Sequence, residues 1–186
     1  MKRISKTSLA AIIILVVLAA AFGVGLWLIL KDNKQYRVLY EDSRVKININ
    51  SAELGAYTAA ELTKMAGMKE FNAKYKPSGK SPIARTYHGF ELKAVFQAAG
   101  IDIAEIKSVS FRAFDGYAKG LFPSDLYKDN EIFIAIKYDG KEFIRGVNSS
   151  GAHYPEEDGG PFVIIKASSE FSYDRIRGLV EINVEV

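Results

Sequence analysis

Few side chains in this sequence have the chemistry of a nucleophile or a metal ligand. Among 186 residues there is no cysteine, and His88 and His153 are the two histidines. The lack of cysteine excludes disulfides, thiolate metal sites and cysteine nucleophiles together. His153 is followed by Glu156, Glu157 and Asp158, a group that could hold a divalent cation although its spacing matches no standard metal motif. We favour the alternative of an exposed acidic loop, and we predict no metal site.

Arg112 and Tyr117 are candidates for ligand contacts. Alternating apolar residues predict a strand over 109–113 that ends at a turn formed by Asp115 and Gly116. The Arg112 guanidinium offers a fork of donors that suits an anion such as phosphate, although an alternating strand would place it equally well on a solvated outer face. Tyr117 follows the turn, and its alternative role is simple packing with a paired hydroxyl.

The stretch 146–160 is the best candidate for a binding surface. It contains small residues, a tyrosine, a proline and three acids, and it leads into Gly159, Gly160 and Pro161. Glycines at this point would let a ligand approach the backbone closely. The alternative is a long surface loop without a function.

The first 30 residues differ from the rest. No charged side chain occurs over residues 9–30. At about 1.5 Å per residue, a helix of that length covers the roughly 30 Å hydrocarbon core of a bilayer. Lys2, Arg3 and Lys6 precede the run, and such basic residues stay on the cytoplasmic side. We expect a cytoplasmic N-terminus over 1–8, a transmembrane anchor over 9–30, a tether over 31–43, and an extracytoplasmic domain over 44–186. A signal peptide cleaved near Ala19–Ala21 is the alternative.

Charge narrows the classes of partner. All 22 acidic residues lie after residue 30, and so do all basic residues except Lys2, Arg3 and Lys6. The expected external domain is therefore formally neutral, which does not fit a nucleic-acid-binding protein. The domain is long enough to bury one hydrophobic core without disulfides or structural metal sites. The expected partners are the membrane and either a small-molecule ligand or a membrane protein.

The remaining pattern predicts a mixed, β-rich α+β fold. Thr58 and Glu61 fit a capping box, and Gly100 suits a helix end. The Asp139–Gly140 pair predicts a hairpin, and the Pro- and Gly-containing stretch within 69–82 predicts a loop. The predicted helices cover 58–67 and 92–99, and the predicted strands cover 44–49, 83–87, 109–113, 132–138, 141–144, 162–165 and 179–186, about six or seven in all.

Several of these segments occur in an order that resembles a known family. The chain resembles the sulfite-oxidase-type molybdopterin-binding domain over about residues 44–186. The segments that carry the resemblance are Tyr-His-Gly-Phe-Glu-Leu at 87–92 with Val-Phe-Gln-Ala-Ala-Gly-Ile at 95–101, Val-Ser-Phe-Arg-Ala-Phe-Asp-Gly-Tyr at 109–117, Ile-Ala-Ile-Lys-Tyr-Asp-Gly-Lys-Glu at 134–142, Gly-Gly-Pro-Phe-Val-Ile-Ile at 159–165 and Arg-Gly-Leu-Val-Glu-Ile-Asn-Val at 177–184.

The resemblance implies molybdopterin as a cofactor and Tyr117 as the counterpart of an active-site tyrosine. Arg112, Asp115, Tyr117, Gly159 and Gly160 are then the expected cofactor contacts. The family depends on a cysteine thiolate that binds molybdenum, and the corresponding stretch of this chain, 69–85, has no cysteine. A serine oxygen does not readily replace that soft ligand.

We therefore expect a membrane-anchored ligand-binding or interaction module without molybdenum–thiolate catalysis. The alternatives are a pterin-dependent oxidoreductase with altered metal ligation and a structural docking subunit of a membrane complex.

Overall fold

The computed structural model describes residues 6–76, 79–143, 159–170 and 175–186, with the side chains of some α1 residues excepted. The chain divides into two compact units, residues 1–35 and 36–186. The long helix α1 (Lys6–Glu41) makes up the first unit and continues through most of the segment predicted as a tether. Its last residues belong to the second unit, where Leu39 packs with Val180 and Phe114.

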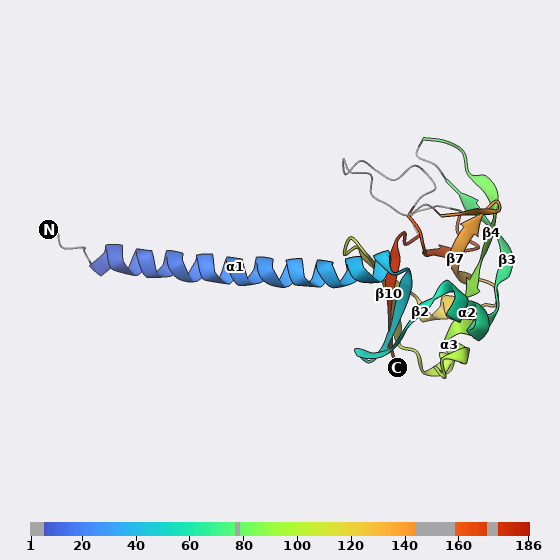
Figure 1. Ribbon diagram of the computed structural model, residues 1–186, viewed down its shortest axis with the longest axis horizontal. Coiled ribbons are helices and arrows are strands. Elements are labelled where there is room, and N and C mark those ends of the chain that lie inside the picture. The colour runs from blue at the N-terminus through green and yellow to red at the C-terminus, as the bar shows by residue number, and fades with distance from the viewer. Residues whose placement is uncertain (1–5, 77–78, 144–158, 171–174) are drawn as a thin grey trace. The chain divides into compact units, whose positions relative to one another are not determined.

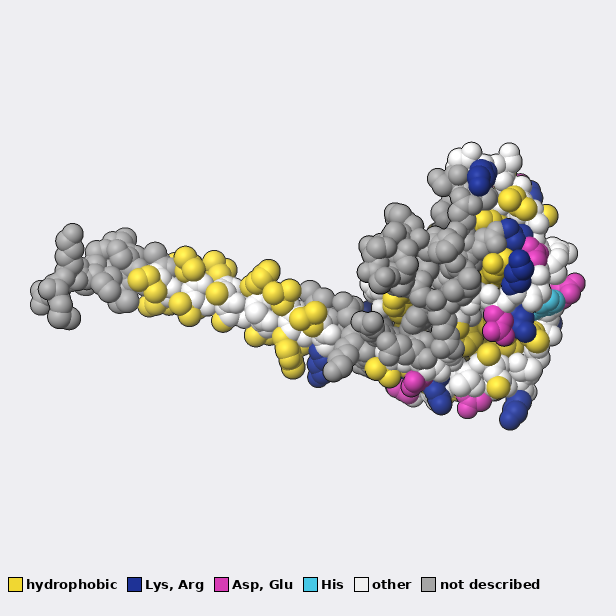
Figure 2. All heavy atoms as spheres, turned by 45° about the horizontal axis from the view of Figure 1, so that its top comes forward, with side chains coloured by type: hydrophobic (Ala, Val, Ile, Leu, Met, Phe, Trp, Pro, Cys, Tyr) yellow, Lys and Arg dark blue, Asp and Glu magenta, His cyan; other side chains and the backbone are white. Residues whose placement is uncertain are grey.

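The described middle of α1 is apolar on its surface. Its described large apolar side chains between Ile12 and Leu30 are between 44% and 70% exposed, and Figure 2 shows groups of apolar atoms along this part of the helix. Among the described residues, no helix reaches the length and apolar character that a membrane crossing requires.

The second unit contains two five-stranded sheets (Figure 1). In the first, which we call sheet A, the last strand in sequence lies in the middle and pairs in parallel with β1 and antiparallel with β5. The remaining pairs are antiparallel. In sheet order the strands are β2 (Ala52–Thr58), β1 (Arg44–Ile49), β10 (Leu179–Glu185), β5 (Ser108–Ala113) and β6 (Ala118–Leu121).

The second sheet, sheet B, is entirely antiparallel and is built around β7. Asp139 and Gly140 have φ of 45° and 76° and join β7 to β8, as the hairpin pattern predicts. Its strands are β3 (Lys69–Tyr75), β4 (Ile83–Glu91), β7 (Ile132–Tyr138), β8 (Lys141–Glu142) and β9 (Val163–Lys166).

The main core lies between the sheets. One cluster of buried side chains joins Ile47 and Ile182 of sheet A to Phe90 and Ile134 of sheet B. A second, aromatic cluster covers the other face of sheet B, where the rings of Phe71 and Phe133 stack with centroids 3.8 Å apart. The alternation of β7 explains both, because Ile132 and Ile134 face one cluster while Phe133 and Ala135 face the other.

Short helices connect several of the strands. The capping box is confirmed, since the Thr58 side chain accepts from the Glu61 N–H and the Glu61 side chain accepts from the Thr58 N–H. Gly67 ends that helix with φ 70°. The helices of this unit are α2 (Ala59–Ala66), α3 (Leu92–Ala98), the 3-10 helix η1 (Ile103–Glu105) and α4 (Pro123–Leu126).

The α+β, sheet-rich character is confirmed, but the prediction misplaces or misses several elements. The stretch predicted as a loop over 69–82 begins with strand β3, because Phe71, Ala73 and Tyr75 alternate and are buried. Strands β2 and β6 and helix α4 were not predicted. In the predicted last strand, a register shift between Leu179 and Glu181 places Val180 in a different cluster from Ile182 and Val184.

Candidate functional site

The residues predicted around the end of β5 form a regular turn. The Asp115 side chain accepts a hydrogen bond from the Tyr117 N–H at 2.9 Å, and the Tyr117 carbonyl accepts from the Ala113 N–H at 2.8 Å. Asp115 therefore holds the turn itself. The Tyr117 side chain is 52% exposed, which fits neither a buried catalytic hydroxyl nor the packed alternative.

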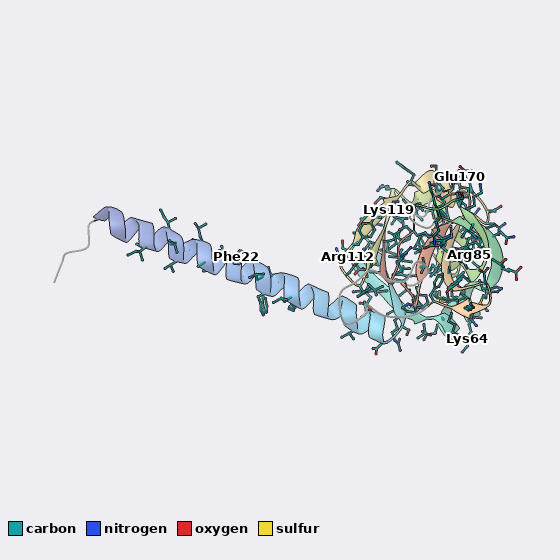
Figure 3. The ribbon with its side chains drawn as sticks, turned by 90° about the horizontal axis from the view of Figure 1, so that it is seen from above. Phe22, Lys64, Arg85, Arg112, Lys119 and Glu170 are labelled. Atoms are coloured by element: carbon teal, nitrogen blue, oxygen red, sulfur yellow. The ribbon has the colours of Figure 1, made fainter. Side chains whose placement is uncertain are left out.

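Arg112 lies on sheet A and is half-buried. It stands opposite Glu181 in the register of β5 and β10, so an acidic side chain is its cross-strand neighbour. Figure 3 shows Arg112 and Arg85 on opposite sides of the domain, and Arg85 belongs to sheet B.

The two glycines of the Gly159–Gly160 turn are buried and closely packed by the chain's own side chains. A Cβ on Gly159, whose φ is +125°, would lie 2.5 Å from the Arg177 Cβ. A Cβ on Gly160 would lie 2.5 Å from the Phe143 Cβ. The space that a ligand would need on this side of the glycines is therefore occupied.

Gly178 forms backbone hydrogen bonds to both predicted turns, the glycine turn at 159–160 and the turn at 113–117. Its N–H donates to the Gly159 carbonyl, and its own carbonyl accepts from the Phe114 N–H at 2.9 Å. The structure thus brings the Gly159 turn and the 113–117 turn to opposite sides of one residue. The rest of the predicted binding loop, 146–158, lies outside the described residues, as does the group at His153 and 156–158.

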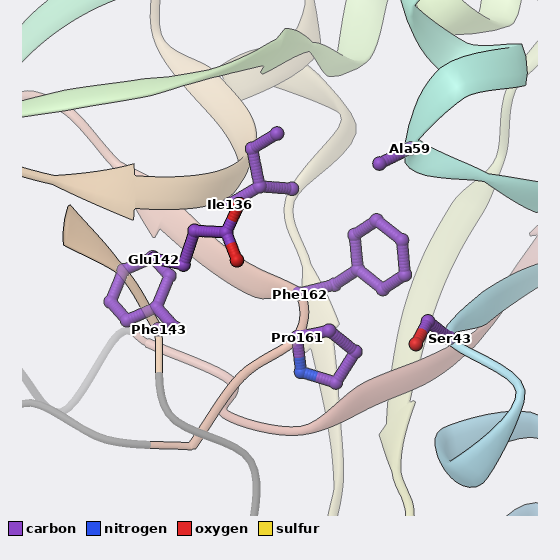
Figure 4. Close-up of a pocket in the computed structure, with 7 residues that line it drawn as sticks. All are labelled: Ser43, Ala59, Ile136, Glu142, Phe143, Pro161 and Phe162. Carbon is purple, nitrogen blue, oxygen red and sulfur yellow. The ribbon is translucent and has the colours of Figure 1, made fainter. Parts of the chain in front are cut away.

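A cavity of about 200 Å³ lies directly beside the glycine turn (Figure 4). Five of its lining residues are apolar. Glu142 and Ser43 supply the polar atoms and lie at opposite ends in Figure 4, with the Phe162 and Pro161 rings between them. The lining residues are Ser43, Ala59, Ile136, Glu142, Phe143, Pro161 and Phe162.

The electrostatics of this cavity favour a hydrogen-bond donor over an anion. Among the lining residues that the structure describes, Glu142 is the charged one, and one of its oxygens lies 3.7 Å from the Lys137 Nζ. The sequence pattern predicted the hairpin that places Glu142 opposite Lys137. Nothing in the sequence pointed to Ser43 or Ala59, because their approach to Pro161 depends on the packing of distant elements.

Sequence reasoning also missed an arginine–tyrosine cluster on sheet B. The Arg175 guanidinium lies over the rings of Tyr75 and Tyr87, at 5.1 and 4.9 Å from their centroids. Arg85 lies 5.3 Å from the centroid of Tyr138 and pairs with Asp139. Burial raises the pKa of Tyr87, and the neighbouring Arg175 charge opposes part of that shift. Because these cations already contact aromatic rings and an acid, the cluster has a structural role.

A molybdopterin cofactor does not fit the residues predicted to hold it. The glycine turn is packed by the chain's own atoms, the Asp115 side chain is engaged by the Tyr117 N–H, and the sequence has no cysteine to bind molybdenum. Among the described residues, no group of three or more histidine, aspartate or glutamate side chains is placed to hold a metal ion.

Comparison with known proteins gives a likeness of fold. No family model and no curated protein matches the sequence. Among solved structures, the chain is similar to the sulfane dehydrogenase SoxCD from Paracoccus pantotrophus, with a TM-score of 0.56 and 12% sequence identity. The match covers 78% of this chain and 39% of that chain. It supports a distant molybdopterin-oxidoreductase-like fold, and at this identity it shows the fold alone.

Proposed function

We propose that this chain is a small-molecule-binding module on a molybdopterin-oxidoreductase-like scaffold, without molybdenum–thiolate catalysis. One observation carries the proposal: the Gly159–Gly160 turn is packed against Arg177 and Phe143 in a chain that has no cysteine. The scaffold therefore lacks both the expected metal ligand and the open glycine turn. The cavity beside Pro161 is the binding site that remains at this position.

The ligand of this cavity has an apolar body and a hydrogen-bond donor. Phe143, Pro161 and Phe162 would contact the apolar part. The Glu142 carboxylate is an acceptor, and the Ser43 hydroxyl can accept or donate. An amine or alcohol satisfies these groups, whereas a phosphate would meet the Glu142 charge.

We also propose that residues 9–30 hold the module at a membrane, with the N-terminus in the cytoplasm and residues 44–186 outside it. Two observations support this proposal. Residues 9–30 contain no charged side chain. The large apolar side chains that the structure describes between Ile12 and Leu30 are exposed. Lipid would cover this surface. Alkaline extraction should leave the full chain in the membrane pellet, and release into the supernatant would contradict the anchor.

Cofactor analysis tests the absence of molybdenum chemistry. The full chain, purified from its own host, should contain neither stoichiometric molybdenum nor a fluorescent pterin after acid oxidation. One molybdenum and one pterin per chain would overturn the proposal in favour of an oxidoreductase with altered ligation.

Two neighbouring alanines give a matched test of the cavity. Ala59 lines it, while Ala60 is exposed on the same helix. Native mass spectrometry of the full chain should show a small molecule that is retained by Ala60→Leu and lost from Ala59→Leu, because leucine at 59 fills the cavity. Equal retention would place the ligand elsewhere. A chain that carries no small molecule but cross-links to a membrane protein would favour a docking subunit.

A further inference from the structure

Strand β6 forms an edge of sheet A, and half of its backbone groups face away from the sheet. At the start of its hairpin the Ala113 N–H donates to the Tyr117 carbonyl, so these two residues form a hydrogen-bonded pair. Bonded and non-bonded pairs alternate along antiparallel strands, and the register therefore puts Ala118 and Gly120 in non-bonded pairs with β5. The N–H and C=O groups of Ala118 and Gly120 point outward.

These outward groups are open to another chain. Ala118 and Gly120 are both exposed, and in the part of the chain that the structure describes neither backbone makes a hydrogen bond outside the pair with β5. The outer side of β9 in sheet B differs, because Ile164 and Ile176 exchange two backbone hydrogen bonds there. An open row of backbone donors and acceptors is a template for a further extended strand.

An apolar cavity of about 140 Å³ reaches the same edge. Gly120, which has no side chain, is one of its lining residues, so the cavity touches the backbone of β6. Phe111, Ile132, Ile164 and Ile176 also line it and are between 1% and 3% exposed. The volume is close to that of an engineered cavity of about 150 Å³ that holds benzene, so it suits one leucine or phenylalanine side chain.

The lining of this cavity favours an apolar occupant. Phe122 belongs to the lining and is 79% exposed, more than any other large apolar side chain whose exposure the structure describes. The charged lining residues already have partners within the chain: the Asp125 Oδ2 lies 2.8 Å from the Lys166 Nζ, and Lys119 also has an interaction partner. The cavity therefore selects its occupant by apolar contact and not by charge.

We propose that β6 is a docking edge for an extended segment of a partner protein, which adds to sheet A as a further strand and inserts one apolar side chain into this cavity. The outward groups of Ala118 and Gly120 call for an extended main chain, which a small molecule does not provide. The proposal is independent of the proposed function, because the described lining residues of this cavity are different from those of the cavity beside Pro161.

The alternation of side chains fixes which partner residue enters the cavity. Two partner residues bond to Ala118 and Gly120, and the residue between them stands opposite Lys119, whose side chain lines the cavity. A second copy of this chain is a poorer occupant. Antiparallel pairing of two β6 strands in this register would place two Lys119 side chains opposite each other, and like charges in that position are destabilising.

NMR of the full chain with three synthetic peptides tests the docking edge. The first is a short threonine-rich peptide with one central leucine, the second has alanine in place of the leucine, and the third carries N-methyl groups on the two residues that flank the leucine. The leucine peptide should slow hydrogen exchange of the Ala118 and Gly120 amides. It should also shift the methyl signals of Ile132, Ile164 and Ile176 in a saturable way.

The other two peptides separate the two parts of the interaction. The alanine peptide should bind at least about tenfold more weakly, because the burial of the leucine is lost. The N-methylated peptide should bind at least about fivefold more weakly, because it lacks the N–H donors for the edge. Equal binding of the three peptides, or saturable binding that leaves both amides unprotected, would overturn the proposal.

Two substitutions of one residue give a matched test on the protein side. Gly120→Pro removes an outward N–H and none of the hydrogen bonds to β5, a change that edge strands tolerate. Gly120→Ala keeps the N–H, and its Cβ would meet the Val109 carbonyl oxygen at an ordinary 3.7 Å. The leucine peptide should bind at least about fivefold more weakly to Gly120→Pro than to Gly120→Ala. Equal binding to both variants would contradict the docking edge.

Two further points keep the test decisive. The comparison of the three peptides uses the wild-type chain, so it stands without the proline variant. Protection of the Ala118 and Gly120 amides in the chain alone, rising with protein concentration, would assign the edge to a second copy and overturn the proposal.

Discussion

The Cα of Gly160 packs against Phe143 so closely that a Cβ at this position would lie 2.5 Å from the Phe143 Cβ and 2.8 Å from its carbonyl oxygen. Gly160→Ala must therefore displace Phe143 and the aromatic cluster around it. We expect the free energy of unfolding to fall by about 1–3 kcal/mol, the usual cost of overpacking. Urea denaturation of the full chain measures this loss.

Gly120→Ala is the matched control for that variant. A Cβ on Gly120 would meet the Val109 carbonyl oxygen at 3.7 Å, an ordinary contact. Its effect should stay within about 0.5 kcal/mol, as for most surface changes. Equal effects of the two alanines would show that Gly160 has room for a side chain, and would reopen the glycine turn as a ligand site.

The buried Asp125–Lys166 pair should be sensitive to the loss of one partner. Lys166→Met leaves a carboxylate that is only 7% exposed, with Lys128 as its remaining neighbour at 3.5 Å. We expect a loss of about 3 kcal/mol of unfolding free energy, the low end for a broken buried pair. The double variant Asp125→Asn, Lys166→Met should recover part of this loss, and an additive double variant would show that the two groups do not interact.

The capping box of α2 should make stability depend on acidic pH. The Thr58 backbone N–H, and then its hydroxyl, donate to Glu61 and lower the pKa of that carboxyl. The stabilisation is therefore present above the unfolded pKa and is lost as the pH falls through the folded pKa. Glu61→Gln should flatten this part of the stability curve, measured by urea denaturation between pH 3 and 6. An unchanged curve in Glu61→Gln would contradict this role of the capping box.

Tyr87 should make the stability of the fold depend on alkaline pH. Burial raises the pKa of its hydroxyl, so the folded state prefers the neutral form. This contribution is complete below the unfolded pKa and disappears as the pH rises through the folded value. In an ultraviolet titration of the full chain, Tyr87→Phe should remove a tyrosine component above the ordinary range. If this variant leaves the component in place, the component belongs to another residue.

Local signals predicted much of this fold. The Thr58–Glu61 box, the Asp139–Gly140 hairpin and the alternation over 109–113 all gave elements that the structure contains. Each depends on side chains within a few positions of one another. Strand β3 was missed because the prolines and glycine beyond residue 76 dominated the interpretation, although Phe71, Ala73 and Tyr75 alternate.

The candidate site was harder to predict because its residues meet only through packing. The Gly159–Gly160 turn drew attention as a place for a ligand, yet its close neighbours are Phe143 and Arg177 from other segments. Ser43 and Ala59 reach the same cavity from the opposite end of the domain sequence. Short-range sequence patterns contain no information about contacts between distant segments. The similarity to a solved structure indicates the fold and does not identify the residues of a site.

The central position of β10 has a kinetic consequence. Asn48 on β1 bonds to Glu181 on β10 across 133 residues of chain, so sheet A can close only through a very long loop. Until that happens, β1 and β5 each present an open row of backbone donors and acceptors to any neighbouring chain. Slow refolding, with a yield that falls as protein concentration rises, is the signature that this topology should leave in a dilution experiment.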